Sequence, residues 1–67
     1  MNAPVITIEQ QVTCCVRELR IRRDVYPRRV AEGKMSQKQA DYEIAAMEAV
    51  LETVRAALPP DLLTEAK

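Results

Sequence analysis

Two runs of apolar residues with helical spacing, joined by a very short connection, constrain this chain most strongly. The first run extends from Ile8 to Val30 and the second from Ala40 to Leu58, in steps of three and four residues except where Arg22 takes an inside position of the first run. Such spacing places a run on one face of an α-helix. The connection EGKM contains Gly33, the only glycine, which can adopt the left-handed conformation that ends a helix. The sequence therefore predicts an all-α fold, an antiparallel helical hairpin.

Capping residues predict where the two helices begin and end. Thr7 is a suitable N-cap, so the first helix is expected over residues 8–32. Ser36 with Gln39 forms a capping-box pattern, and Pro59 with Pro60 ends the second helix, which is expected over residues 36–58. We expect one domain over residues 1–67, with flexible residues 1–6 and a short tail, residues 59–67, that either forms one turn or frays.

Pro27 falls inside the first predicted helix. It lacks the amide that would bond to the carbonyl of Arg23, and its ring crowds that carbonyl. We expect a kink at Pro27 or a short restarted turn after it, and the alternative is a helix that stops near Val25.

The two apolar runs match when the chain folds back near residues 34 and 35. Facing residues then have numbers that sum to about 69 or 70, as for Leu19 with Leu51. Arg22 occupies an inward position in this register, one turn from the inward-pointing Glu43. The sequence predicts an ion pair between Arg22 and Glu43 across the hairpin.

A lone hairpin would leave further apolar and small residues in water, and a chain of 67 residues buries only about 60% of its unfolded surface. We expect a homodimer in a four-helix arrangement, and the alternative is ordinary scattered surface apolar groups. The predicted dimer interface consists of Cys14, Ile21, Val25, Tyr42, Ala46, Ala49 and Thr53.

Several classes of function are disfavoured by the residues present. The chain has no histidine, no glycine-rich phosphate loop and no nucleophile with an evident base, so we expect no enzyme, no catalytic residue, no metal site and no cofactor. Its two cysteines are neighbours, which favours reduced thiols and a cytoplasmic location. No stretch is long and apolar enough for a membrane span, and the N-terminus does not resemble a signal peptide.

Charge is unevenly distributed along the chain. Residues 17–38 carry a net charge of +5 and residues 39–67 a net charge of −4. Arginine suits bidentate contacts to carboxylate or phosphate, which favours a protein-binding module with a nucleic-acid-binding dimer as the alternative. The basic residues could instead form a solvated face, and Tyr26 could be core rather than contact. The predicted partner-binding residues are Arg20, Arg23, Tyr26, Arg28 and Arg29.

The stretch from Arg17 to Arg55, with VYPRRV, GKMSQ and ADYEIAAMEAV, resembles a group of small helical proteins of tailed phages and prophages. It is similar to the branch that comprises phage quorum-sensing anti-activators. This resemblance implies a small helical dimer that acts in the host cytoplasm. It also implies inhibitory binding to a host protein, the DNA-binding domain of a LuxR-type activator, and binding to the type IV pilus assembly ATPase as well.

Overall fold

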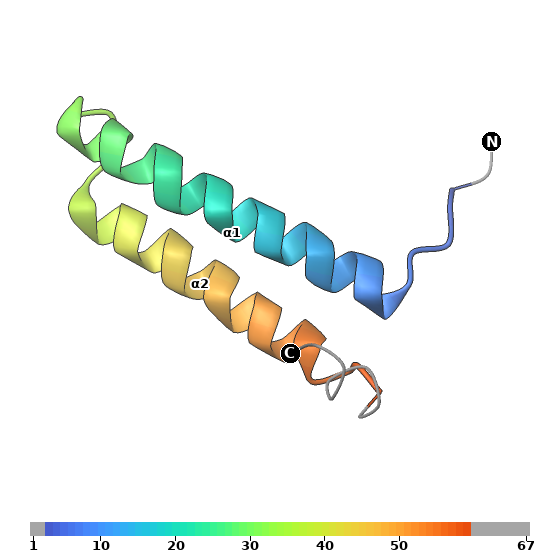
Figure 1. The fold of residues 1–67 in the computed structure, drawn as a ribbon. Coiled ribbons are helices and arrows are strands. Elements are labelled where there is room, and N and C mark those ends of the chain that lie inside the picture. Colours follow the sequence, from blue (N-terminus) through green and yellow to red (C-terminus); the bar gives the residue numbers. More distant parts are fainter. Residues whose placement is uncertain (1–2, 60–67) are drawn as a thin grey trace.

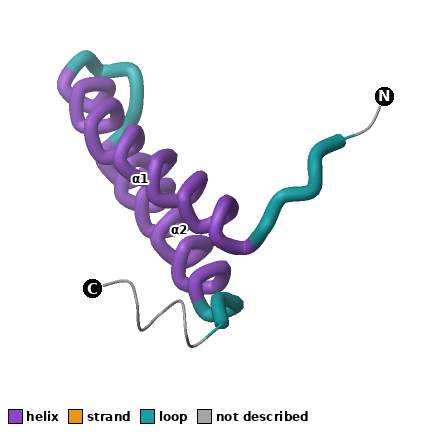
Figure 2. Tube along the Cα trace, turned by 45° about the vertical axis from the view of Figure 1, so that its right-hand side comes forward, coloured by secondary structure: helices purple, strands orange, loops and turns teal. Residues whose placement is uncertain are grey.

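The computed structural model describes residues 3–59 and contains two helices, α1 (Ile8–Ala31) and α2 (Gln37–Arg55). The helices run antiparallel and lie side by side, joined by a tight turn, and the N-terminal part of the longer α1 extends past the end of α2 (Figures 1 and 2). No strand occurs within residues 3–59. The predicted all-α hairpin is confirmed. In the part of the chain that is described, neither helix combines the length and apolar character required to cross a bilayer.

The N-terminus of α1 is closed by its own side chains. The Thr7 hydroxyl accepts a hydrogen bond from the Gln10 amide at 3.1 Å, and the Gln10 side chain accepts one from the Thr7 amide at 2.9 Å. This reciprocal pair satisfies two amides that have no partner inside the helix. The predicted N-cap at Thr7 is confirmed, and residues 3–7 lead into it without helical structure.

The turn between the helices depends on Gly33, which has a φ angle of +74°. The Lys34 amide donates to the Arg29 carbonyl at 2.9 Å, and the Gly33 amide donates to the Val30 carbonyl at 3.0 Å. These two bonds form a Schellman motif, which satisfies the last carbonyls of α1. The predicted left-handed role of Gly33 is confirmed, and α1 ends one residue before the expected position.

Helix α2 is capped at its start and tightens at its end. The Ser36 hydroxyl accepts from the Gln39 amide at 3.0 Å, but the reciprocal half of the predicted capping box is not formed among the described residues. The prediction that α2 extends to residue 58 is wrong, since the α-helix ends at Arg55. The Ala57 and Leu58 amides bond three residues back rather than four. Pro59 restricts the preceding backbone, and the last turn accordingly narrows into a 3₁₀ geometry.

Helix α1 continues through Pro27 to Ala31 without interruption (Figure 1). The alternative of a helix that stops near Val25 is wrong, as is a restart after the proline. Pro27 is exposed, so its ring meets solvent rather than the second helix. The helix tolerates one missing amide because two features stabilise its last turns. The Schellman turn ends the helix, and α2 packs against it. A bend at Pro27 stays a prediction.

The core is a thin seam between the helices. Within residues 3–59, three side chains are buried, Cys15, Leu19 and Ala40, which are 8%, 5% and 2% exposed. The rest of the two apolar runs is half-buried along the same seam: Ile8, Val12, Tyr26, Val30, Ile44, Met47, Leu51, Val54 and Leu58. Leu19 and Leu51 line one surface depression together, as the predicted register requires. In the described part of the chain, a single layer of two helices thus leaves the large apolar residues other than Leu19 partly in water.

The predicted ion pair across the hairpin is confirmed. One Arg22 guanidinium nitrogen donates to the Glu43 carbonyl at 2.8 Å and lies 3.5 Å from its carboxylate, while Nε donates to Glu18 at 3.0 Å. The guanidinium carbon also lies 6.0 Å from the centroid of the Tyr26 ring. The hydrogen bond to Glu18 raises the pKa of Arg22 above its usual value, despite partial desolvation. Arg22 therefore remains charged inside the seam.

Candidate functional site

Two ion pairs connect the helices and define two different edges of the seam. Arg22 pairs with Glu43 on one edge. Arg23, the next residue, pairs with Glu48. Successive residues of a helix point about 100° apart, so these pairs lie on opposite sides of the buried line through Leu19. The two edges carry different chemistry.

The Arg23 edge contains a depression that we call the arginine cleft, lined by Val16, Leu19, Arg20, Arg23, Leu51 and Arg55. Its volume is about 310 Å³ and it is open to solvent. Its aliphatic side chains come from both helices and are called the floor below, and its three arginines are called the rim. Within residues 3–59, Arg23 has an acidic partner, whereas Arg20 and Arg55 have none within ion-pair distance. The cleft thus joins aliphatic surface to positive charge.

The five predicted partner-binding residues do not meet at one place. Arg20 and Arg23 line the arginine cleft. Arg28 and Arg29 line a separate shallow depression near the closed end, where Arg28 bonds to the Asp24 carboxylate at 2.7 Å. Tyr26 lies half-buried between the helices, with its ring near Arg22. The structure therefore provides two basic areas rather than one basic face.

The Arg22 edge continues into what we call the apolar face, defined by Ile21, Val25, Tyr42, Ala46 and Val50. Val50 follows Glu43 by seven residues and Val25 follows Arg22 by three, so both lie beyond this edge. In the single chain, Tyr42 is 69% exposed, Ile21 49% and Val50 47%. Val25 and Ala46 are half-buried. Both helices therefore expose large apolar side chains to water.

The other predicted interface residues, Cys14, Ala49 and Thr53, are exposed. Thr53 donates its hydroxyl to the Ala49 carbonyl at 3.1 Å, and that bond leaves its methyl group at the surface. All seven predicted interface residues thus have accessible surface in the single chain, although Cys14 lies nearer the open end than the apolar face.

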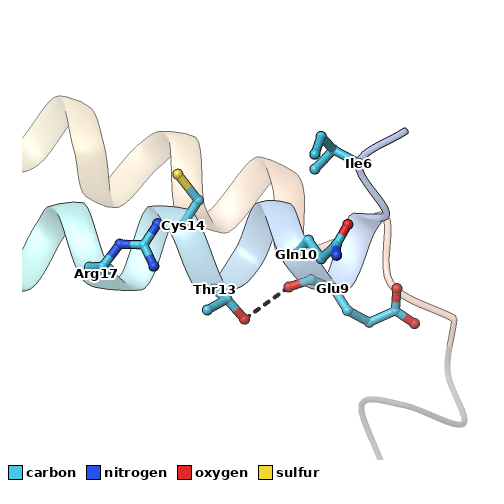
Figure 3. Close-up of a pocket in the computed structure, with 6 residues that line it drawn as sticks. All are labelled: Ile6, Glu9, Gln10, Thr13, Cys14 and Arg17. Atoms are coloured by element: carbon cyan, nitrogen blue, oxygen red, sulfur yellow. Dashed lines mark hydrogen bonds between the residues drawn. The ribbon is translucent and has the colours of Figure 1, made fainter. Parts of the chain in front are cut away.

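A third depression, of about 520 Å³, lies on the outer side of the N-terminal half of α1. Figure 3 shows its lining of Ile6, Glu9, Gln10, Thr13, Cys14 and Arg17, with the Thr13 hydroxyl bonded to the Glu9 carbonyl. The exposed Cys14 thiol is free, as is the buried thiol of Cys15. No cluster of residues that could hold a metal ion occurs in the described part of the chain.

Two surface residues of interest, Arg55 and Val50, were missed by sequence reasoning. Arg55 lies in the acidic half of the chain, one turn after Leu51 on α2, and only the pairing of the helices brings it beside Arg20. Val50 directly precedes Leu51, and its exposure depends on which side of α2 faces α1. A helical wheel of α2 drawn against the predicted register could have found both.

Comparison with protein-family models, with curated proteins and with solved structures finds no match to this chain.

Proposed function

We propose that this protein is a dimeric protein-binding module that binds and inhibits a host regulatory protein. The observation that carries the proposal is the exposure of Ile21, Tyr42 and Val50 on a hairpin that buries only three side chains among its described residues. A fold this thin needs further burial of apolar surface to be stable. A second copy would supply that burial on the apolar face. The Arg23 edge would then stay available for a partner protein.

The side chains of the apolar face fit a four-helix dimer. On α2 the small residues Ala46, Ala49 and Thr53 allow close approach of a second helix, and Tyr42 and Val50 add large apolar contacts. Two-fold symmetry would place the same residues on both copies. Each contact would therefore occur twice across the interface.

The arginines support binding of a protein target at the surfaces that the dimer leaves free. Arginine is enriched at the energetically dominant positions of protein interfaces, and its fork matches carboxylates. The resemblance of the VYPRRV, GKMSQ and ADYEIAAMEAV segments to phage anti-activators supports a target in the host cytoplasm. The candidates are the DNA-binding domain of a LuxR-type activator and the type IV pilus assembly ATPase.

A binding experiment tests this function. Wild-type protein and a variant with Arg28→Glu and Arg29→Glu are immobilised and exposed to host lysate, then to each purified candidate. The proposal expects specific capture of a regulatory protein by the wild type and at least about tenfold weaker binding by the variant, since charge reversal places like charges together. Recovery of the same proteins by both would contradict the role of these arginines.

The alternative of a nucleic-acid-binding dimer is supported by Arg20 and Arg55, which have no acidic partner within residues 3–59. Nucleic-acid binding through phosphate contacts weakens steeply as salt rises. A shift of plain duplex DNA at moderate salt, lost at high salt, would favour this alternative over the protein target.

A further inference from the structure

The arginine cleft has the form of a receptor for one element of another protein. Its lining comes from both helices, with Arg20 and Arg23 on α1, Arg55 on α2 and aliphatic side chains on each helix. Leu19 is 5% exposed and Leu51 is half-buried. An apolar side chain bound on the floor would cover the part of Leu51 that is now in water. The groove between two antiparallel helices accepts a third helix in the usual manner of helix packing.

The arginines at the rim favour a partner segment that carries carboxylates. Arg20 and Arg55 are without acidic partners within residues 3–59, and the Arg23–Glu48 pair joins side chains that are 57% and 48% exposed. An exposed pair of this kind contributes little, so Arg23 can exchange Glu48 for another carboxylate at small cost. Up to three guanidinium groups are thus available above one aliphatic floor.

We infer that the arginine cleft binds an acidic amphipathic helix of a partner protein, with a leucine-sized side chain on the floor and carboxylates against the three arginines. The inference rests on the proposed function, because it assumes a protein target. The inference places the contact on an acidic surface of that target rather than on a basic surface that contacts DNA. Helix-in-groove binding with flanking charge complementarity is a common recognition mode.

The composition of the cleft favours protein over nucleic acid. A phosphate backbone would pair with the arginines but would leave Leu19, Leu51 and Val16 without an apolar partner. An acidic helix satisfies the charges and the floor together.

The probe is a fluorescent designed helical peptide with two leucines four residues apart among glutamates, and a matched peptide has lysine in place of each glutamate. Fluorescence anisotropy measures binding to the full-length protein. The cleft variant carries Arg20→Gln and Arg55→Gln. The control variant carries Lys34→Gln and Lys38→Gln, which remove the same positive charge from exposed sites outside the cleft. Circular dichroism establishes that every variant keeps its helices.

The inference expects the acidic peptide to bind the wild type and the control variant equally, and the cleft variant at least about tenfold more weakly. The lysine peptide should not bind. Equal weakening in both variants, or no binding of the acidic peptide at about 1 mM, would overturn the inference. Tighter binding of duplex DNA than of the peptide, lost in the cleft variant, would also overturn it by assigning the cleft to nucleic acid.

Two further comparisons test whether another segment occupies the cleft and whether the inference and the proposed function fail separately. Full-length protein with Asp61→Asn and Glu65→Gln tests the chain's own acidic tail, and a gain of tenfold or more in peptide affinity would assign the cleft to that tail instead. A host target that binds the cleft variant as well as the wild type would refute the cleft and leave the proposed function intact. Peptide binding in the cleft without any host target would refute the proposed function alone.

Discussion

Replacing Gly33 with alanine isolates the contribution of the turn to stability. The φ angle of Gly33 is +74°, and a Cβ built there has no atom within 4 Å, so no steric clash contributes. An L-residue in the left-handed region costs about 1–2 kcal/mol. Alanine also reduces the entropy of the unfolded chain, which returns about 0.4–1 kcal/mol. Gly33→Ala should therefore lower the free energy of unfolding by about 1 kcal/mol.

A chemically synthesised chain with the D-enantiomer of alanine at position 33 is the matched control. It adds the same methyl group but prefers positive φ, so it should stabilise the hairpin by about 0.4–1 kcal/mol. Thermal unfolding at one fixed protein concentration measures both, with about 4–8 °C for each kcal/mol. If the L-alanine chain were as stable as the wild type, or both enantiomers lost stability equally, the left-handed turn would not be the cause.

Three other substitutions test separate parts of the hairpin. Leu19→Ala should cost about 2–3 kcal/mol in urea unfolding, because Leu19 is the one large side chain buried between the described helices; a cost below about 0.5 kcal/mol would contradict that role. Arg22→Ala should cost about 1–2 kcal/mol, and Arg22→Met should recover at least half, since the stem of Arg22 packs in the seam; equal losses would mean that the charge alone matters. Pro27→Ala should raise the melting temperature by restoring the missing amide of α1; a lower melting temperature would show that the hairpin depends on the proline.

The fold could be predicted from the sequence because its determinants are local. The apolar spacing, Thr7, Ser36 and Gly33 each act within one or two turns of helix. The register followed from the length of the turn, and the Arg22–Glu43 pair followed from the register. The end of α2 was misplaced because Pro59 acts on the turn before it, which tightens rather than continuing as α-helix.

The candidate site was harder to predict because it depends on contacts between the helices. Net charge along the sequence grouped Arg28 and Arg29 with Arg20, although they line different depressions. Arg55 belongs to the acidic half of the chain and reaches the cleft only through the pairing of α2 with α1. A one-dimensional charge balance cannot show which edge of a hairpin a side chain joins.

Sedimentation equilibrium at micromolar concentration tests the dimer most directly, with wild-type protein, Val50→Glu on the apolar face and Ala45→Glu as an exposed control elsewhere on α2. The account predicts twice the 7.6 kDa mass of one chain for the wild type and for the Ala45 variant. It predicts loss of that dimer for the Val50 variant, since a buried unpaired carboxylate is costly. A folded wild-type monomer, or a Val50 variant that dimerises as tightly as the wild type, would contradict it.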